Sequence, residues 1–261
     1  SPSIAVSPET RLALTSAAAA LAEGVGYTNA GTVEFLLDSE ERFYFLEMNT
    51  RLQDEQPVTE MVTGIDLVQW QLRIAQGERL TVDADQMLEP RGHAIECRIY
   101  AEDPDAGFLP SPGHIRYLRR PAGPGIRDDS GVEEGFDIPV FYDSMISKLI
   151  AWGDNRSAAM ARLERALAEY GVGGVKTTLP FFRWLLQRPE FVSGNVDTGF
   201  LDGILADGER TAFSDTPVDV EERAVLATAL RAYLRAETPA NGAVKNAVTG
   251  WRRAARLEAL G

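Results

Sequence analysis

Apolar and polar positions in the first 80 residues alternate with two different periods. Ser7-Pro8-Glu9 places a capping serine before a helix-starting proline and an acidic residue, so a helix is predicted from here to about Gly24. Residues 31–38 (GTVEFLLD) and 42–49 (RFYFLEMN) favour strands, and SEER between them predicts an antiparallel hairpin. A second helix is expected over 66–76, before a glycine.

From residue 92 onward, short apolar stretches alternate with turns rich in proline and glycine. Strands are predicted in HAIECRIYAED, GHIRYLRRP and MISKLIAWG, which occupy residues 93–103, 113–121 and 145–153. Amphipathic helices are predicted over 156–171 and 178–191. Residues 207–221 are polar and acidic and are expected to form a linker before a helix over 221–237. These elements predict an α+β fold with an antiparallel sheet.

Composition narrows the class of protein. The 261 residues are 44% hydrophobic and 25% charged, which is enough for one large core or two smaller ones. The net charge of −13 argues against nonspecific binding to nucleic acid or anionic membranes, and no apolar run approaches the roughly 18 residues of a membrane helix. The single cysteine, Cys97, excludes an internal disulfide and fits a reducing compartment, so a cytoplasmic location is expected.

Two glutamates are predicted to lie opposite each other in the hairpin. With a four-residue loop over 39–42, Asp38 pairs with Phe43 and Glu34 pairs with Glu47, which puts both carboxylates on one face. Like charges so close repel each other, so Mg²⁺ would fit between them, with Asn49 as a further oxygen ligand. The alternative is that both glutamates lie on the solvent-exposed face of a half-buried hairpin. The opposite face is expected to form core with Val33, Phe35, Leu37, Tyr44, Leu46 and Met48.

The segment after the second strand carries groups that suit a small oxyanion. Arg51 can hold a planar anion with two parallel hydrogen bonds, and Gln53 adds a neutral donor. Glu55 is a candidate general base. Together with a metal ion, these groups suit phosphoryl transfer onto an oxyanion. His93 and His114 are interpreted as turn or sheet residues rather than ligands.

Other charged residues are given structural roles. Glu60 is expected to interact with the dipole at a helix N-terminus. Lys148, on an apolar strand, is expected to pair with Asp143 or Asp154 and has no assigned chemistry. Three further side chains are interpreted as solvated strand charges: Arg116, Arg119 and Arg120.

Several of these motifs occur together in one known family. The stretch GTVEF…FYFLEMNTRLQDEQPVTEMVTGIDLV, followed in order by GHAIECRIYAEDP, FLPSPGHI, YDSMISKLIAWG and GVKTTLPF, resembles biotin carboxylase, the ATP-grasp subunit or domain of biotin-dependent carboxylases. The resemblance implies the C-terminal part of an ATP-grasp fold over 1–80 and the biotin carboxylase C-terminal domain over 81–206. Residues 207–261 resemble a linker and the start of a helical region that leads to the biotin carrier in acetyl- and propionyl-CoA carboxylase α chains.

The resemblance also implies a reaction. The family couples MgATP cleavage to bicarbonate activation through carboxyphosphate and then carboxylates N1′ of biotin. By position, Glu34 and Glu47 would bind the nucleotide and its Mg²⁺ or Mn²⁺, with Asn49 as a further metal ligand. Leu36 would line the adenine pocket.

The remaining site residues are implied in the same way. Arg51, Gln53 and the main chain at Asp54 would bind bicarbonate. Glu55 would accept the proton of bicarbonate. Arg98, which by pattern alone is an exposed strand arginine, would bind biotin and stabilise negative charge on the ureido oxygen.

The implied partners are ATP, bicarbonate, a biotin carrier domain, a carboxyltransferase subunit and a second copy of the chain in a homodimer. Two other functions remain compatible with the pattern. One is a noncatalytic dimerisation or scaffold module, and the other is an ATP-grasp ligase that makes carbamoyl or acyl phosphates. The segment ECRIYAEDP, which carries Arg98, argues against the second. The acyl-CoA acceptor is not encoded in these residues.

The chain departs from the family pattern at two positions, because it has Asp54-Glu55-Gln56 where the family reads Val-Glu-His. A carboxylate at position 54 would repel an incoming anion, and Gln56 cannot carry a positive charge. The phosphate-binding lysines and glycine-rich lid of the family lie upstream of the matching segment, and the only lysines here are Lys148, Lys176 and Lys245. With no initiator Met, the chain is expected to begin inside a longer protein, to bind MgATP poorly alone and not to turn over.

Overall fold

The computed structural model describes residues 1–82, 89–206, 213 and 225–230. The chain divides into two compact units, Ser1–Phe213 and Ser214–Gly261. In the second unit residues 225–230 are helical, inside the helix predicted over 221–237. Of the helices in these ranges, none has the length and apolar character needed to cross a membrane. The division at residues 80 and 206 stays a prediction.

The N-terminal elements begin with the predicted helix. Helix α1 (Pro8–Gly24) is capped by Ser7, whose hydroxyl accepts a hydrogen bond from the Thr10 N–H at 3.2 Å. The hairpin is also confirmed, and its strands β1 and β2 are Thr32–Leu37 and Phe43–Asn49. Two short helices follow, α2 (Gln56–Thr63), which the sequence pattern did not predict, and α3 (Leu67–Ala75), which it did.

A three-stranded antiparallel sheet is the centre of the following part. Its order is β3 (His93–Tyr100), β10 (Met145–Gly153) and β8 (Ile126–Ser130). The strands predicted around 93–103 and 145–153 are therefore confirmed. Strand β8 was missed, because its sequence IRDDS is too polar to be recognised as a strand.

Short strands extend this part in three further antiparallel pairs. The pairs are β4–β5, β6–β9 and β7–β11. A short 3-10 helix, η1 (Pro104–Ala106), lies between the strands of the first pair. The first pair is β4 (Glu102–Asp103) with β5 (Leu109–Pro110), and the second is β6 (Gly113–His114) with β9 (Asp137–Ile138). The third is β7 (Tyr117–Arg119) with β11 (Gly171–Gly173).

The helix predicted over 178–191 is in fact two helices. Helix α6 (Leu179–Leu185) ends before Pro189, and α7 (Pro189–Ser193) starts at that proline. Proline cannot donate the backbone hydrogen bond and disfavours a helical residue before it, so Arg188 is extended, with ψ 125°. The predicted helix over 156–171 is confirmed as α5 (Arg156–Glu169), and α8 (Phe200–Ala206) was not predicted.

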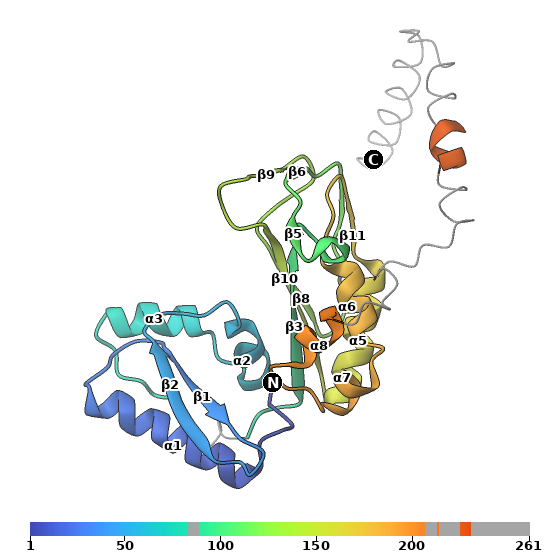
Figure 1. Ribbon diagram of the computed structural model, residues 1–261. Helices are drawn as coiled ribbons and strands as arrows, with labels where there is room; N and C mark the ends of the chain where they lie inside the picture. The colour runs from blue at the N-terminus through green and yellow to red at the C-terminus, as the bar shows by residue number, and fades with distance from the viewer. Residues whose placement is uncertain (83–88, 207–212, 214–224, 231–261) are drawn as a thin grey trace, which may run out of the picture. The chain divides into compact units, whose positions relative to one another are not determined.

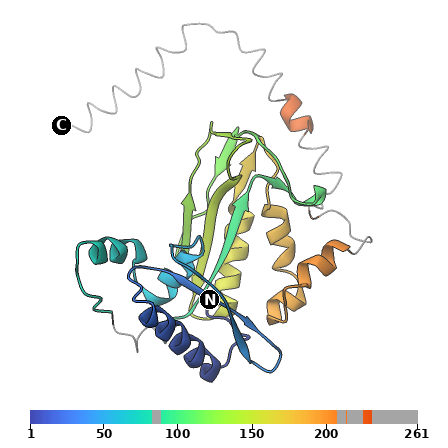
Figure 2. The same cartoon turned by 60° about the vertical axis from the view of Figure 1, so that its left-hand side comes forward.

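The sheet β3–β10–β8 buries a different set of side chains on each face. On one face, residues such as Cys97, Ile99 and Leu149 pack against α5 and α6, and Figures 1 and 2 show these helices beside that face. On the other face, Ala94 and Ile150 pack against apolar residues of α2. The sheet therefore holds α2, and the segment that leads into it, beside β3 and β10.

One residue of the predicted linker is part of the core. Phe213 is buried, and its ring makes edge contacts with the rings of Phe181 and Trp184 at centroid distances of 5.3 and 5.2 Å. Its N–H donates to the Asp105 carboxylate at 2.7 Å. The other residues of the predicted linker lie outside the described residues.

Candidate functional site

The hairpin places Glu34 directly opposite Glu47, as predicted. The predicted pairing of Asp38 with Phe43 is wrong, because Phe43 pairs with Leu37. The loop is tighter than assumed, since the Asp38 N–H donates to the Arg42 carbonyl at 3.0 Å. A bulge between the Glu34 and Phe35 pairs compensates for the tighter loop, so the register at the glutamates is unchanged.

The bulge changes which side chains share a face of the hairpin. Phe35 lies in edge-to-face contact with Phe43 and Phe45, at ring-centroid distances of 5.4 and 6.4 Å. Tyr44 pairs with Leu36 and so lies on the face of Glu34. The predicted core face was therefore wrong: Leu37, Tyr44 and Leu46 are exposed, and Val33, Phe35 and Met48 are only partly buried. The exposed apolar side chains of the hairpin are Leu36, Leu37, Tyr44, Phe45 and Leu46.

A single amide joins the two opposed carboxylates. The Asn49 side-chain N–H₂ donates to Glu34 Oε1 at 2.8 Å and to Glu47 Oε1 at 3.1 Å. The Gln53 amide reaches the same Glu34 oxygen at 3.5 Å. Among the described residues no group of three or more His, Cys, Asp or Glu side chains converges, so the oxygen-rich site is two carboxylates and two amides.

A pocket of about 630 Å³ connects this cluster to the segment that leads into α2. Its lining brings together Glu34, Arg51, Gln53 and Glu55. These four residues come from β1 and from the turn between β2 and α2, so the hairpin and the α2 packing fix them relative to each other. Glu47, Asn49 and Leu36 do not line the pocket itself.

Arg98 approaches the start of α2 from β3. Its guanidinium Nη1 lies 3.6 Å from Glu55 Oε1 and 4.0 Å from Asp54 Oδ2. Arg98 and Asp54 are both about half exposed, so this ion pair lies at the rim of the site. Arg98 therefore lies close to Asp54 and Glu55, although it follows them in the sequence by 43 or more residues.

Lys148 also reaches this turn, which the sequence did not predict. Its ammonium donates to the main-chain carbonyl of Asp54 at 3.1 Å. The expected pairing with Asp143 or Asp154 is wrong, because the side chains of β10 alternate and Lys148 faces the α2 side of the sheet beside Arg98. Finding this contact requires the register of β10 against β3, which cannot be derived from the sequence alone.

Glu96 is a second residue that the sequence reasoning missed. It lies two positions before Arg98, on the same face of β3, and its Oε2 is buried with no hydrogen-bond partner. Burial raises the pKa of this carboxyl to about 7, against the opposing effect of the Lys148 ammonium. The site therefore includes a half-buried carboxyl that exchanges its proton near neutral pH.

Glu60 places its carboxylate at a helix N-terminus, as predicted, but at that of α3 rather than that of its own helix α2. It lies within α2, and its Oε1 accepts the N–H of Leu67, the first residue of α3, at 2.8 Å. Its Oε2 accepts from Arg127 at 2.6 Å, and Arg127 also binds Asp129. These contacts join α2, α3 and β8.

Arg120 and the histidines have structural partners. Arg120 is about half exposed, as expected of a solvated charge, but it lies just after β7 and its Nε is 2.7 Å from Asp128, whose side chain is only 4% exposed. Burial raises the pKa of Asp128. His93 and His114 are strand residues, as predicted; His93 is buried and His114 contacts Asp137 at 2.8 Å.

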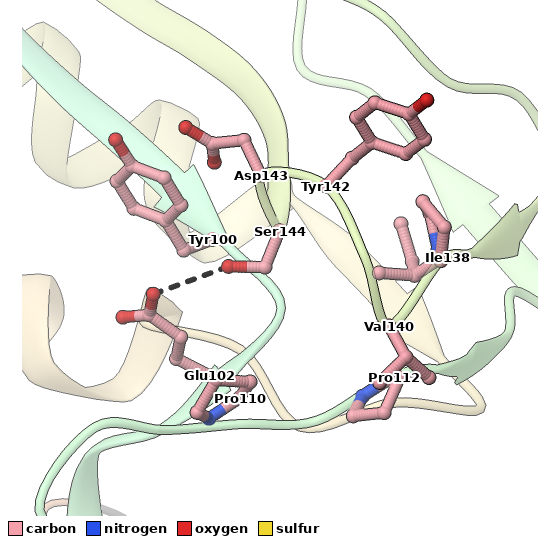
Figure 3. A pocket seen from close by; sticks show the side chains of 10 residues that line it. Tyr100, Glu102, Pro110, Pro112, Ile138, Val140, Tyr142, Asp143 and Ser144 are labelled. Carbon is pink, nitrogen blue, oxygen red and sulfur yellow. Dashed lines mark hydrogen bonds between the residues drawn. The ribbon is translucent and has the colours of Figure 1, made fainter.

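A second pocket, of about 470 Å³, lies at the Tyr100 end of β3 (Figure 3). Tyr100 lines it together with the loop before β10, and the Ser144 hydroxyl donates to Glu102 at 3.1 Å across its wall. Val140, Phe141 and Tyr142 in this loop are largely exposed. The pocket thus borders the Arg98 end of the site.

Comparisons with known proteins agree with this geometry. Residues 96–203 match the biotin carboxylase C-terminal domain, and residues 1–83 match the ATP binding domain of the carbamoyl-phosphate synthase L chain. Biotin carboxylase of a Nostoc species is 52% identical over 200 residues, covering 77% of this chain and 44% of the relative. The propionyl-CoA carboxylase alpha chain of Sus scrofa is 44% identical over 271 residues, covering 98% of this chain and 36% of the relative.

A solved structure is similar in three dimensions. The biotin carboxylase domain dimer of Hydrogenobacter thermophilus 2-oxoglutarate carboxylase, in complex with MgADP, ADP and bicarbonate, has a TM-score of 0.76 and 43% identity. The match covers 78% of this chain and 45% of that chain. This chain therefore spans less than half the length of the relatives it matches.

Fold and site together define the class: the chain contains the C-terminal part of an ATP-grasp fold, followed by an α+β domain on an antiparallel sheet. It belongs to the biotin carboxylase family.

Proposed function

We propose that this chain supplies part of the active site for the ATP-dependent carboxylation of biotin with bicarbonate, through carboxyphosphate, in a biotin-dependent acyl-CoA carboxylase. The observation that carries the proposal is the approach of Arg98 to Glu55 within 3.6 Å, beside a pocket lined by Arg51 and Gln53. The proposed cationic group for biotin, Arg98, and the proposed base for bicarbonate, Glu55, then lie next to each other.

The metal-binding role fits the residues present. Glu34 and Glu47 face each other, and an amide N–H₂ of Asn49 bridges them. Carboxylate and amide oxygens are the ligands that Mg²⁺ and Mn²⁺ prefer, and a cation between opposed carboxylates relieves their repulsion. When bound, the metal would neutralise charge on the nucleotide phosphates. Leu36, exposed on the same face of β1 as Glu34, is proposed to contact adenine.

Bicarbonate would bind at the turn before α2. Arg51 and Gln53 line the pocket, and the main-chain N–H of Asp54 is not used by another protein group in the described residues. Arginine binds a planar anion with two parallel hydrogen bonds, so this set suits bicarbonate. Glu55, in the same lining, would accept the bicarbonate proton and leave an oxygen free to attack phosphorus.

Arg98 would stabilise the negative charge that develops on the ureido oxygen of biotin. A guanidinium stays protonated and is already in place, so it does not have to reorganise as charge develops. Its contacts with Glu55 and Asp54 hold it at the rim of the pocket until biotin arrives.

The partners and location follow from the same proposal. A biotin carrier domain would present biotin, a carboxyltransferase subunit would use the product, and the chain would act as a homodimer. The alignment with the propionyl-CoA carboxylase alpha chain over 98% of this chain supports an acyl-CoA carboxylase α chain as the parent protein. We propose a cytoplasmic location on the basis of the single cysteine, Cys97, which is free and buried.

Bicarbonate-dependent ADP release in the presence of free biotin tests the proposal. The chain alone is expected to release no ADP. A chimera in which residues 1–206 replace the matching part of the Nostoc biotin carboxylase is expected to release ADP only when bicarbonate is present. The matched control is the same chimera with Glu55→Gln, which keeps the size of the side chain and removes the base.

The possible results of these assays lead to different conclusions about the chain. Bicarbonate-dependent ADP release by the chain alone would contradict the expectation that it is an incomplete site. A chimera with no more activity than its Glu55→Gln variant would contradict the proposed function. A noncatalytic dimerisation module would instead give a dimer by light scattering and no heat on titration with MgADP or bicarbonate.

A further inference from the structure

Lys148 makes a specific contact with the main chain of the proposed bicarbonate site. Its Nζ donates to the Asp54 carbonyl at 3.1 Å. This link joins β10 to the turn before α2 across 94 residues of sequence. Lys148 itself is half-buried, while its contact with the Asp54 carbonyl is exposed to water.

Lys148 has charged neighbours on both adjacent strands and on the turn before α2. In the sheet register it lies between Arg98 on β3 and Asp129 on β8, and Glu96 is its diagonal neighbour on the same face. The Asp54 carbonyl faces it from the turn, and Arg127 holds Asp129 by three hydrogen bonds. Lys148 and Arg98 are therefore two cations beside the turn, and Glu96 and Asp129 are their carboxylate neighbours in the sheet.

Fixing the Asp54 carbonyl also fixes the neighbouring N–H. The carbonyl of Asp54 and the N–H of Glu55 belong to one trans peptide, so they point in opposite directions. With the carbonyl held by Lys148, the Glu55 N–H points away from the sheet. Within the described residues, the N–H groups of Asp54 and Glu55 donate to no protein acceptor, and they lie at the positive end of α2.

We propose that Lys148 is a positioning residue, which orients the Asp54–Glu55 peptide so that its N–H can bind the anion and the Glu55 carboxylate can accept its proton. The inference rests on the proposed function, since it concerns the same anion. Lys148 itself does not touch bicarbonate in this proposal and acts through the turn. Arg51 and Gln53 supply the direct side-chain contacts.

The test is a titration of the ¹⁵N-labelled chain with sodium bicarbonate, followed by the amide signals of Asp54 and Glu55, with sodium chloride keeping ionic strength constant. In Lys148→Met the apparent Kd for bicarbonate is expected to rise about tenfold, the size expected when one charge-assisted hydrogen bond is lost. Lys148→Arg keeps a donor and is expected to restore most of the affinity. Lys176→Met, an exposed lysine far along the chain, makes the same change of charge and is expected to bind like the original chain.

Two further signals separate positioning from a general loss of structure. The response of the Glu34 and Glu47 amides to MgCl₂ and the urea midpoint are expected to be unchanged in Lys148→Met. Equal bicarbonate affinity in Lys148→Met and Lys176→Met would overturn the inference while the proposed function stands. If the unsubstituted chain gives no bicarbonate response at Asp54 or Glu55, the proposed anion site is wrong, and the inference falls with it.

Discussion

At the scale of single residues, the site depends on a few side chains whose contacts in the structure are not evident from the sequence pattern. Arg98 is one of several arginines on strands, yet its position 3.6 Å from Glu55 makes it part of the pocket rim. Asp54 is exposed and contacts the same arginine at 4.0 Å. The departure from the family residue at position 54 therefore bears directly on Arg98, which is proposed to stabilise charge on the ureido oxygen of biotin.

Restoring the family residues at positions 54 and 56 is expected to raise activity. Asp54→Val removes a carboxylate that repels bicarbonate and competes for Arg98. Gln56→His replaces an amide whose oxygen is buried without a partner. In the chimera, the double variant is expected to increase kcat/KM for bicarbonate about threefold or more, in line with removing a repulsive contact of about 1 kcal/mol. An unchanged or lower kcat/KM, with KM for ATP also unchanged, would contradict this expectation.

Glu96 predicts a pH dependence of stability. Burial raises its pKa to about 7, so the folded chain binds this proton more tightly than the unfolded chain does. The charged groups that face it are Arg98, Lys148, Asp54 and Glu55. The free energy of unfolding is therefore expected to decrease as the pH rises from about 4.5 to about 7, because charging the buried carboxyl is unfavourable.

Glu96→Gln, which cannot ionise, measures this effect. At pH 8 the variant is expected to be more stable than the original chain by about 1 kcal/mol, well below the full value of a pKa shift because solvent screens a half-exposed group. At pH 5 the two are expected to unfold at nearly the same urea concentration. Glu164→Gln, on an exposed position of α5, serves as the control and is expected to show no pH-dependent difference. A Glu96→Gln difference that is the same at both pH values would contradict the assignment.

At the scale of elements, the hairpin and α2 show how local rules combine. The loop residues set a tighter turn than assumed, and the bulge at Leu46 restores the register of Glu34 with Glu47. Helix α2 is short and has no side-chain cap, so its position depends on Val58, Met61 and Val62 packing against the sheet and on Glu60 binding Arg127. Without that packing, an eight-residue helix is not stable in water.

The Glu60–Arg127 pair is expected to hold α2 and α3 to β8. Arg127→Met keeps the apolar stem but leaves the Glu60 carboxylate, which is 10% exposed, without its partner. The variant is expected to lose about 2 kcal/mol in free energy of unfolding. In a double-mutant cycle with Glu60→Gln, a coupling energy of about 1 kcal/mol is expected from urea titrations. Arg119→Met, on an exposed strand position, is the matched control.

At the scale of the whole molecule, the central sheet β3–β10–β8 has an apolar core on one face. Its other face has both apolar and charged side chains and carries the site. The core under α5 and α6 contains the side chains that give the fold its stability, such as Ile99, Leu149, Leu163 and Tyr170. The opposite face changes from apolar at Ala94 and Ile150 to charged at Arg98 and Lys148 along the same strands. The site therefore lies where the α2 packing ends.

Phe213 is expected to contribute to the stability of the whole first unit. Its ring is buried against Phe181 and Trp184, although it lies in the stretch of sequence predicted as a linker. Phe213→Ala is expected to lower the free energy of unfolding by about 3 kcal/mol, as for other large core truncations. Phe141→Ala, at a position that is 92% exposed, is the matched control and is expected to change the stability little. A chain that ends at 206 is expected to unfold at a lower urea concentration than one that ends at 213.

The sequence by itself determined the elements with strong local signals. Ser7 caps its helix as predicted, because a side-chain oxygen next to the first helical turn acts over a few residues. Asp66, predicted as the first residue of its helix, is the residue that caps it. The pairing of Glu34 with Glu47 was also predicted, although it holds because two deviations cancel: the loop is tighter than assumed, and the bulge at Leu46 restores the register. The family resemblance adds the roles of the site residues, which the sequence pattern alone cannot assign.

Only the tertiary structure decided which distant charges meet. Lys148 lies 94 residues from Asp54, and Glu60 lies 67 residues from Arg127. Their contacts depend on the register of β3, β10 and β8 and on the packing of α2 against that sheet. Neither is encoded in a short stretch of sequence, because a strand register is set by core packing over the whole sheet. The polar strand β8 was missed because its sequence has no apolar pattern, and Phe213 was missed because its burial depends on contacts with Phe181 and Trp184 in a distant segment.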